Sequence, residues 1–184
     1  MKLYAAASIP VLLALLLAGY CGLILLEWLR EGKRRVDWIY VVALAGYAGI
    51  YVYLTFLVRE PESTARLRLV PFYSLARLLT PGETRTVQLF REILLNILLY
   101  VPMGSLLRGC LRHTRHPHLY TFLAGFGATI LTEVMQYALR MGLAETDDVI
   151  HNCLGLIIGI CGFEVAAAAA SALRGRDSCP KSGT

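Results

Sequence analysis

Residues 119–159 read LYTFLAGFGATILTEVMQYALRMGLAETDDVIHNCLGLIIG. Two apolar runs, each long enough for a membrane helix, flank a short polar hairpin that contains Glu145, Asp147 and Asp148. The first run also carries Glu133, although a carboxylate in the middle of a span costs about 2.5–3.5 kcal/mol on insertion scales. A chain that keeps this group beside several acids and amides is expected to use it, so we predict that the hairpin forms the working site.

The composition indicates a membrane protein. Of the 184 residues, 57% are hydrophobic and 17% are charged, and the mean hydropathy is +0.57, whereas a soluble domain has about 25% charged residues. The net charge of +5 does not indicate nucleic-acid binding, because the basic residues lie at the ends of apolar segments, where they orient membrane helices. The five cysteines show no metal-binding spacing and none lies in a predicted outer loop, so we predict no disulfide framework, metal site or cofactor.

Apolar segments predict an all-α integral membrane helical bundle with five transmembrane helices. They are Leu3–Leu26, Ile39–Val58, Ile93–Leu107, Leu119–Leu139 and Val149–Leu173. The third segment is short and contains Pro102, which should kink the helix. Between the second and third segments, Leu75, Leu78 and Leu79 share one helical face, which predicts a short helix lying on the membrane, with a solvated loop as the alternative.

The distribution of lysine and arginine predicts the orientation of the bundle. Short basic segments at residues 27–37, 108–118 and 174–184 fall on one side, which is therefore the predicted cytoplasmic side. This arrangement predicts an outside amino terminus and a cytoplasmic carboxyl terminus. We expect one transmembrane domain over residues 1–173 and a disordered cytoplasmic tail over residues 174–184.

In this orientation three spans supply polar side chains to one outer level. Asn96 comes from the third span, Glu133 and Gln136 from the fourth, and Asn152 from the fifth. At 100° per residue, Arg140 lies on the same helical stripe as Glu133 and Gln136.

The start of the fifth span carries a second pattern. Asp148 and Asn152 are four residues apart and therefore share a helical face. Gly155 and Gly159 continue close to that face as a pair of small residues, which lets this span approach another helix closely.

Three interpretations of these polar groups are open. A glutamate in apolar surroundings near an arginine suits a general acid or base, which makes Glu133 and Arg140 candidate catalytic residues. Acids and amides at one level can instead bind hydroxyl groups or an amine. The candidate ligand-binding residues are Asn96, Gln136, Asp147, Asp148 and Asn152. In the third interpretation these groups only join helices, through hydrogen bonds worth about 0.6 kcal/mol each.

An ordered set of short motifs resembles the VanZ-like family. Residues 96–104, NILLYVPMG, resemble the family segment N-x-x-x-[FY]-x-P-x-G, and residues 133–136, EVMQ, resemble E-x-x-Q. Residues 140–155 resemble R-x(n)-D-D-x-x-x-N-x-x-G, except that Glu145 stands where an aspartate is usual. The resemblance covers a core of roughly residues 71–162 within the predicted domain.

The resemblance implies a multi-pass protein of the bacterial plasma membrane with a role in low-level resistance to the glycopeptide teicoplanin. Teicoplanin carries a lipid tail and acts at the outer membrane leaflet. The expected partners are therefore membrane lipids and a glycopeptide or lipid-linked envelope ligand, bound at an outward-facing polar site. The alternatives are a membrane enzyme that acts on an envelope lipid with Glu133 as acid or base, and a structural scaffold.

Overall fold

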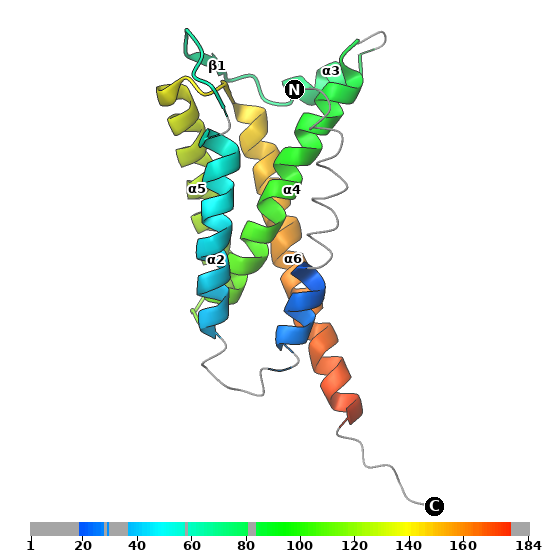
Figure 1. Cartoon of the computed structure of the whole chain (residues 1–184). Helices are drawn as coiled ribbons and strands as arrows, with labels where there is room; N and C mark the ends of the chain where they lie inside the picture. The colour runs from blue at the N-terminus through cyan, green and yellow to red at the C-terminus, as the bar shows by residue number, and fades with distance from the viewer. Residues whose placement is uncertain (1–18, 28, 30–36, 58, 81–83, 178–184) are drawn as a thin grey trace, which may run out of the picture.

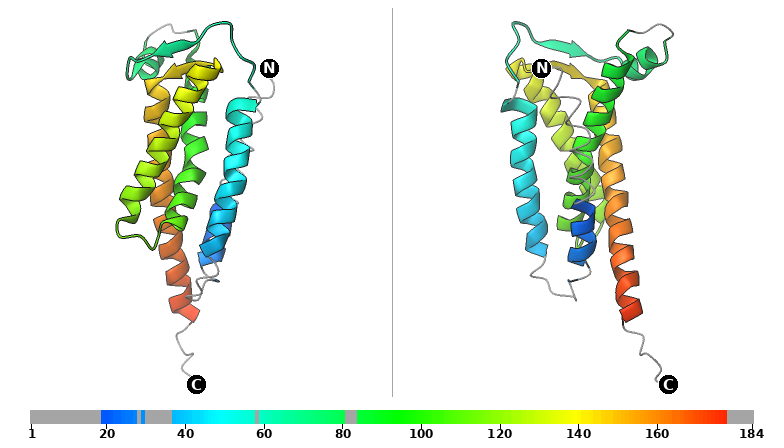
Figure 2. Two further views of the ribbon diagram at one scale, coloured as in Figure 1. Left: turned by 90° about the vertical axis from the view of Figure 1, so that its left-hand side faces the viewer. Right: turned by 45° about the vertical axis from the view of Figure 1, so that its right-hand side comes forward.

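The computed structural model describes residues 19–27, 29, 37–57, 59–80 and 84–177. Long helices run alongside one another, and short elements cross one end of them (Figure 1). The elements are α2 (Asp37–Val52) with its π-helical continuation η2 (Tyr53–Leu57), β1 (Arg66–Arg68), α3 (Tyr73–Leu78), α4 (Thr86–Cys110), α5 (Pro117–Leu139), β2 (Leu143–Glu145) and α6 (Thr146–Asp177). We call the end that carries β1, β2 and α3 the strand end; Figure 2 shows it from two further sides.

Among the described residues, four helical segments are long and apolar enough to cross a membrane. They are Trp38–Leu57, Thr86–Cys110, Pro117–Leu139 and Thr146–Leu173. These segments confirm the predicted membrane helical bundle and its multi-pass character. The remaining predicted span, Leu3–Leu26, lies largely outside the described residues, so the total of five spans and the orientation of the termini stay predictions.

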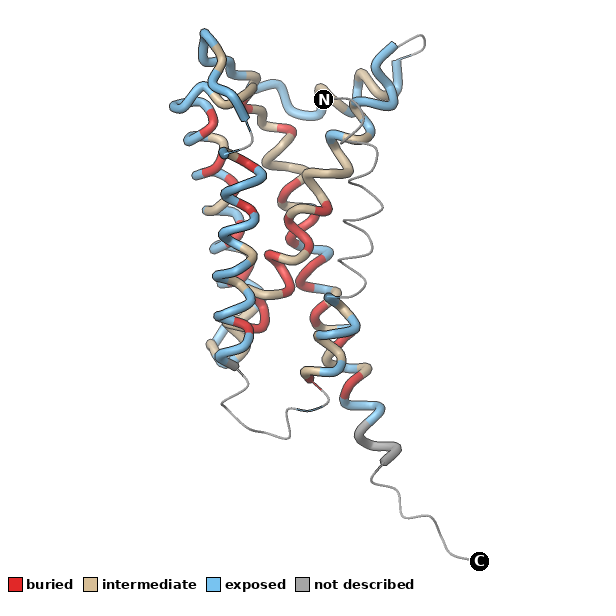
Figure 3. Tube along the Cα trace, in the orientation of Figure 1, coloured by how far each residue is buried: buried red, intermediate tan, exposed pale blue. Residues whose placement is uncertain are grey.

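Burial follows the pattern of a bundle that faces lipid. Buried positions run along the facing sides of α4 and α6, whereas the outer sides of α2 and α5 are largely exposed (Figure 3). Large apolar side chains occupy these outer sides, such as Val42 on α2 and Val134 on α5. A soluble protein rarely exposes so much apolar surface, so this surface indicates contact with lipid.

The helix that contains Pro102 is longer than the sequence predicts. The predicted span Ile93–Leu107 lies inside α4, which begins at Thr86 and continues through Pro102 to Cys110. The first turns of α4 are too polar to be read as membrane sequence, but they are still helical, and Gln88 donates a hydrogen bond to Glu92 over 2.9 Å on their surface. The third span is therefore not short, because helical hydrogen bonding continues beyond the apolar run.

The two central helices touch through glycines. A Cβ atom added at Gly155 of α6 would lie 2.1 Å from the carbonyl oxygen of Ile97 on α4. At Gly159 the corresponding distance is 2.2 Å to the oxygen of Val101. These contacts confirm that small residues bring the last span close to another helix, and they identify that helix as α4. Since the partners advance together along both chains, α4 and α6 run in the same direction.

A short parallel strand pair closes the strand end. Arg66, Leu67 and Arg68 of β1 pair with Leu143, Ala144 and Glu145 of β2. The prediction of a purely helical chain missed this pair, because three-residue strands are too short to show an alternating pattern. The pairing attaches the long segment between α2 and α4 to the turn between α5 and α6.

The structure also tests the predicted short helix before α4 and the predicted end of the last span. The leucine pattern predicted a short helix before α4, and α3 forms at Tyr73–Leu78. Helix α6 continues to Asp177, beyond the predicted end of the membrane domain at residue 173. The rest of the predicted disordered tail lies outside the described residues.

The glycine contact predicts a strong response to a single methyl group. Gly155→Ala should lower the free energy of unfolding by about 1–3 kcal/mol, because overpacking a close contact displaces the backbone. Titration with SDS in detergent micelles measures the change. The matched control is Gly127→Ala on α5, where an added Cβ meets nothing within 4 Å. Equal stability of the two variants would contradict the close approach of α4 and α6.

The predicted orientation can be tested with single cysteines in a chain that lacks its native ones. A cysteine at the exposed Glu60, near the strand end, should react with a membrane-impermeant thiol reagent in intact cells. A cysteine at the exposed Arg115, at the opposite end, should react only after lysis. The reverse pattern would overturn the orientation.

Candidate functional site

A hydrogen bond between two helices marks the centre of the strand-end site. Asn96 of α4 donates from Nδ2 to Oδ1 of Asp148 on α6, over 2.6 Å. Both side chains are only partly exposed. The structure therefore brings together two of the residues that the sequence singled out, and the bond fixes the rotation of α4 against α6.

A second bond joins α5 to α6. Nδ2 of Asn152 donates to Oγ1 of Thr129 over 2.7 Å, and Asn152 is buried. Its Oδ1 has no hydrogen-bond partner among the described residues. Gln136 is also buried, and its backbone oxygen accepts a bond from the nitrogen of Met141 as α5 ends.

The carboxylate of Glu133 meets the turn between α5 and α6. Its Oε2 accepts a hydrogen bond of 3.0 Å from the backbone N–H of Glu145. The carboxylate of Glu145 in turn accepts two bonds from Nη1 of Arg68, at 3.1 and 3.2 Å. Burial raises the pKa of Glu145 above the usual range of a glutamate, although Arg68 opposes the shift. Each acid is thus held by a donor from a different element.

Asp147 connects α6 to α3. It is 2% exposed, and its Oδ2 accepts a 2.6 Å bond from the backbone N–H of Ser74 in the first turn of α3. The residue that precedes α3, Phe72, supplies no side-chain cap. Asp147 therefore performs the capping role from a distant part of the chain, while its Oδ1 has no partner among the described residues.

Arg140 does not lie where the helical stripe placed it. It ends α5 in the left-handed conformation (φ 59°, ψ 34°), and this conformation turns the chain out of the helix. Its Nη1 lies 3.5 Å from the oxygen of Ser63, and its side chain is exposed. The cation that interacts electrostatically with Glu133 and Asp148 is instead Arg59. The extrapolation failed because Arg140 is the first residue beyond the regular helix.

An apolar pocket lies beside these groups, with a volume of about 390 Å³. It is bounded by the last turns of α5, by β2 and the start of α6, and by the segment around β1. The lining residues are Leu67, Leu69, Ile130, Glu133, Val134, Tyr137, Ala144, Glu145, Thr146 and Val149. Of the predicted site residues only Glu133 lines this pocket, whereas Asn96, Asp148 and Asn152 bond to neighbouring helices. The structure thus separates Glu133, which lines the pocket, from the predicted site residues that join the bundle.

The middle of the bundle contains hydroxyl bonds that the sequence analysis missed. The hydroxyl of Tyr51 on α2 lies 2.7 Å from the hydroxyl of Tyr100 on α4 and 2.7 Å from Oγ1 of Thr132 on α5. Tyr47 also donates to the backbone oxygen of Leu99. Tyr47 and Tyr51 are one turn apart on α2, but their partners are distant in sequence.

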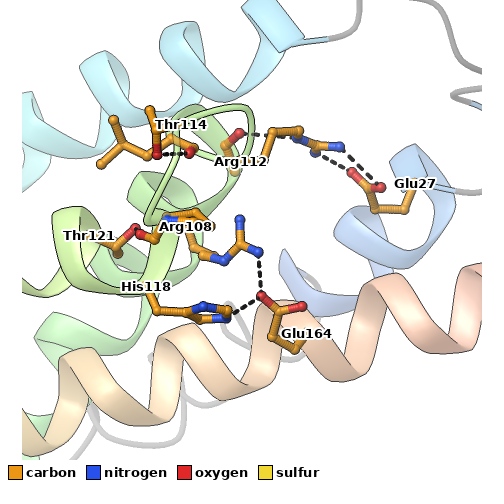
Figure 4. A network of polar contacts seen from close by, with 10 residues as sticks. Glu27, Arg108, Arg112, Thr114, His118, Thr121 and Glu164 are labelled. Carbon is orange, nitrogen blue, oxygen red and sulfur yellow. Dashed lines mark hydrogen bonds and ion pairs between the residues drawn. The ribbon is translucent and has the colours of Figure 1, made fainter.

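The opposite end carries a network of charges (Figure 4). Arg112 pairs with Glu27 over 2.5 Å. Glu164 accepts from Nη2 of Arg108 at 2.6 Å and lies 3.0 Å from Nε2 of His118. The sequence indicated a basic segment here, but not these pairs, because the partners come from segments that are far apart along the chain.

The Asn96 bond predicts a loss of stability on truncation. Asn96→Ala should lower the free energy of unfolding by about 1–3 kcal/mol, because the partly buried Asp148 loses its donor. Gln88→Ala, which removes an exposed hydrogen bond from the same helix, should change it by less than about 0.5 kcal/mol. SDS titration in micelles compares them, and an Asn96→Ala variant as stable as Gln88→Ala would rule out a structural bond.

The comparison with protein families agrees with the resemblance found in the sequence. The family model described as VanZ/LLP1 matches residues 38–167, which is more than half of the chain. No curated protein and no solved structure matches the chain. The matched segment contains all the predicted site residues, from Asn96 to Asn152, together with the strands and the pocket. The chain belongs to the VanZ/LLP1 family.

Proposed function

We propose that this protein binds a lipid-like or glycopeptide ligand at the strand end, on the outer face of a bacterial plasma membrane. In this proposal the binding contributes to low-level glycopeptide resistance, of which teicoplanin resistance is the example that the family resemblance implies. The chain acts as a binding protein, and Glu133 is the polar group that recognises the ligand beside the apolar pocket.

The observation that carries the proposal is the pocket itself. Its volume of about 390 Å³ lies in the range of sites for small ligands. Its walls are chiefly apolar, and two carboxylates, Glu133 and Glu145, belong to the lining. An apolar cavity with a few polar groups suits an amphiphile, which has a hydrocarbon part and a polar part. Teicoplanin, which carries a lipid tail, and a lipid-linked envelope precursor both meet this description.

A membrane enzyme that acts on an envelope lipid is the second candidate. It is favoured by the way in which Glu133 is held: the N–H of Glu145 fixes Oε2, while Oε1 has no hydrogen-bond partner among the described residues. A carboxylate with one oxygen fixed and the other available is a suitable general acid or base. In this version Arg59, rather than Arg140, is the cation that influences Glu133.

The third candidate is a scaffold in which the polar groups only join helices. The bonds of Asn96 and Asn152 support such a role for those two residues. They do not account for Glu133, whose bond is to the adjoining turn and whose side chain lines the pocket.

Glu133→Gln is the discriminating variant, because it keeps the shape of the side chain and removes its charge. Bacteria that express the chain should tolerate more teicoplanin than bacteria without it. Glu133→Gln should reduce this tolerance at an unchanged folded yield, measured by size exclusion in detergent. The matched control is Glu92→Gln, an exposed acid on α4 that bonds only to Gln88 among the described residues.

The outcomes separate the three candidates. A partial loss of tolerance in Glu133→Gln supports binding, whereas complete loss at normal yield supports catalysis. A loss of tolerance that only follows a loss of yield supports the scaffold. Wild-type tolerance in Glu133→Gln at normal yield would reject both site functions.

A further inference from the structure

We infer that the strand-end pocket holds an acyl chain of an anionic phospholipid, whose phosphate binds Arg59 and Arg140. The inference rests on the proposed binding function and names the class of ligand. It is carried by the walls of the pocket, by the surface onto which the pocket opens, and by the ion pairs of the surrounding arginines.

The walls suit a hydrocarbon chain. Ile130, Val134 and Tyr137 lie on successive turns of α5 and line the pocket together with Leu67 and Leu69. At 1.5 Å per residue, the wall from Ile130 to Tyr137 is about 10 Å long. It runs along α5 toward the strand end, and so from the hydrocarbon region toward the headgroups.

The surroundings of the pocket place its opening toward lipid. Leu67 is 54% exposed, Leu69 is 69% exposed and Val134 is 56% exposed. In a membrane bundle, large exposed apolar side chains form the surface that lipid tails cover. A lipid chain can therefore enter from the bilayer without crossing water, whereas a water-soluble ligand would have to displace lipid from this surface.

Two of the four arginines near the strands are neutralised within the protein. Arg66 forms an ion pair with Glu62, and Arg68 forms one with Glu145 over 3.1 Å. These two arginines are the first and last residues of β1. Their ion pairs attach the strand to the loop before it and to β2. Their charges are already compensated.

Arg59 and Arg140 differ from this pair. Among the described residues neither forms a direct ion pair with a carboxylate, although Arg59 interacts with Glu133 and Asp148 at longer range, and both side chains are exposed. Nη1 of Arg59 donates to the backbone oxygen of Met141 over 3.2 Å, and Arg140 directly precedes Met141. The guanidinium of Arg59 is thus attached to the turn that leads into β2, and Arg140 is part of that turn, with its guanidinium near the oxygen of Ser63. Residues of β2 line the pocket. Since each guanidinium has five N–H donors, most of them remain for a ligand.

Gly142 leaves room for Arg59 in this place. Its φ is +127°, and a Cβ atom there would lie 3.0 Å from Nη1 of Arg59. A larger residue would therefore push the guanidinium away from the turn, besides straining the backbone.

The choice of phosphate over an ammonium group follows from the partners already made. Glu145 already accepts from Arg68, so an amine there would have to compete with a donor of the protein. At Glu133 one oxygen is taken by the N–H of Glu145, which leaves an amine a single acceptor. A phosphate would meet the exposed guanidinium groups of Arg59 and Arg140, and at Arg59 it would compete only with the longer-range attraction of Glu133 and Asp148. Arginine also matches phosphate oxygens with two parallel hydrogen bonds.

Native mass spectrometry of the full chain in detergent tests the inference. The probes are phosphatidylglycerol and diacylglycerol with identical acyl chains, of which only the first carries a phosphate. Phosphatidylglycerol should bind about tenfold more tightly, as expected for charge-assisted hydrogen bonds. The double variant Arg59→Gln/Arg140→Gln should abolish this preference and leave diacylglycerol binding unchanged. The control is Arg115→Gln, which changes an exposed arginine at the opposite end.

A second variant separates the headgroup from the pocket. Val134→Trp should fill the pocket and weaken binding of both lipids. The control is Val165→Trp on α6, which should leave binding unchanged because Val165 is 69% exposed and lies outside the pocket lining. An unchanged preference in the double arginine variant, equal binding of both lipids to the wild type, or adducts of free phosphate alone would overturn the phosphate site. Unchanged lipid binding in Val134→Trp would instead reject the pocket, and with it the proposed function.

Discussion

The architecture of this protein depends on the contact between the backbones of α4 and α6. Gly104, Gly155 and Gly159 leave no room for a side chain between the two helices, because an added Cβ atom would lie within 2.4 Å of a carbonyl oxygen at each of them. Such a contact permits little sliding or rotation, so it fixes the register of the two helices. That register brings Asn96 to Asp148 one to two turns above the glycines. Everything at the strand end is built on this alignment, since β2 leads directly into α6.

The strand end shows how acids are accommodated next to a membrane. Each of the four acids has a hydrogen-bond donor from another segment: Asn96 for Asp148, the N–H of Ser74 for Asp147, Arg68 for Glu145, and the N–H of Glu145 for Glu133. These bonds reduce the cost of burying polar groups. They also link α3, β1 and the turn before α6 into one cap above the helices. Only Glu133 and Glu145 of the four line the pocket, which is why the proposed ligand contacts involve the α5 side of the cap.

Sequence reasoning predicted the helices and the level of the polar groups, because both depend on local patterns. The apolar runs located the four spans that the structure describes, and the Gly155–Gly159 spacing predicted a close helix contact. Partners across the fold were not predictable. The extrapolated stripe from Glu133 to Arg140 failed because a left-handed residue ends the helix. The strand pair, the Tyr51–Tyr100 bond and the pair of Glu27 with Arg112 each join residues that are far apart along the chain, and a single sequence contains no local signal for such pairs.

The central claim is that α5, β1 and the start of α6 enclose a lipid site beside Glu133. An experimentally determined structure of the full chain in lipid nanodiscs measures this most directly. The account predicts elongated density between Leu67, Val134 and Val149, with its polar end close to Arg59 and Arg140. A pocket closed by the protein's own side chains, with Glu133 turned away from it, would contradict the account.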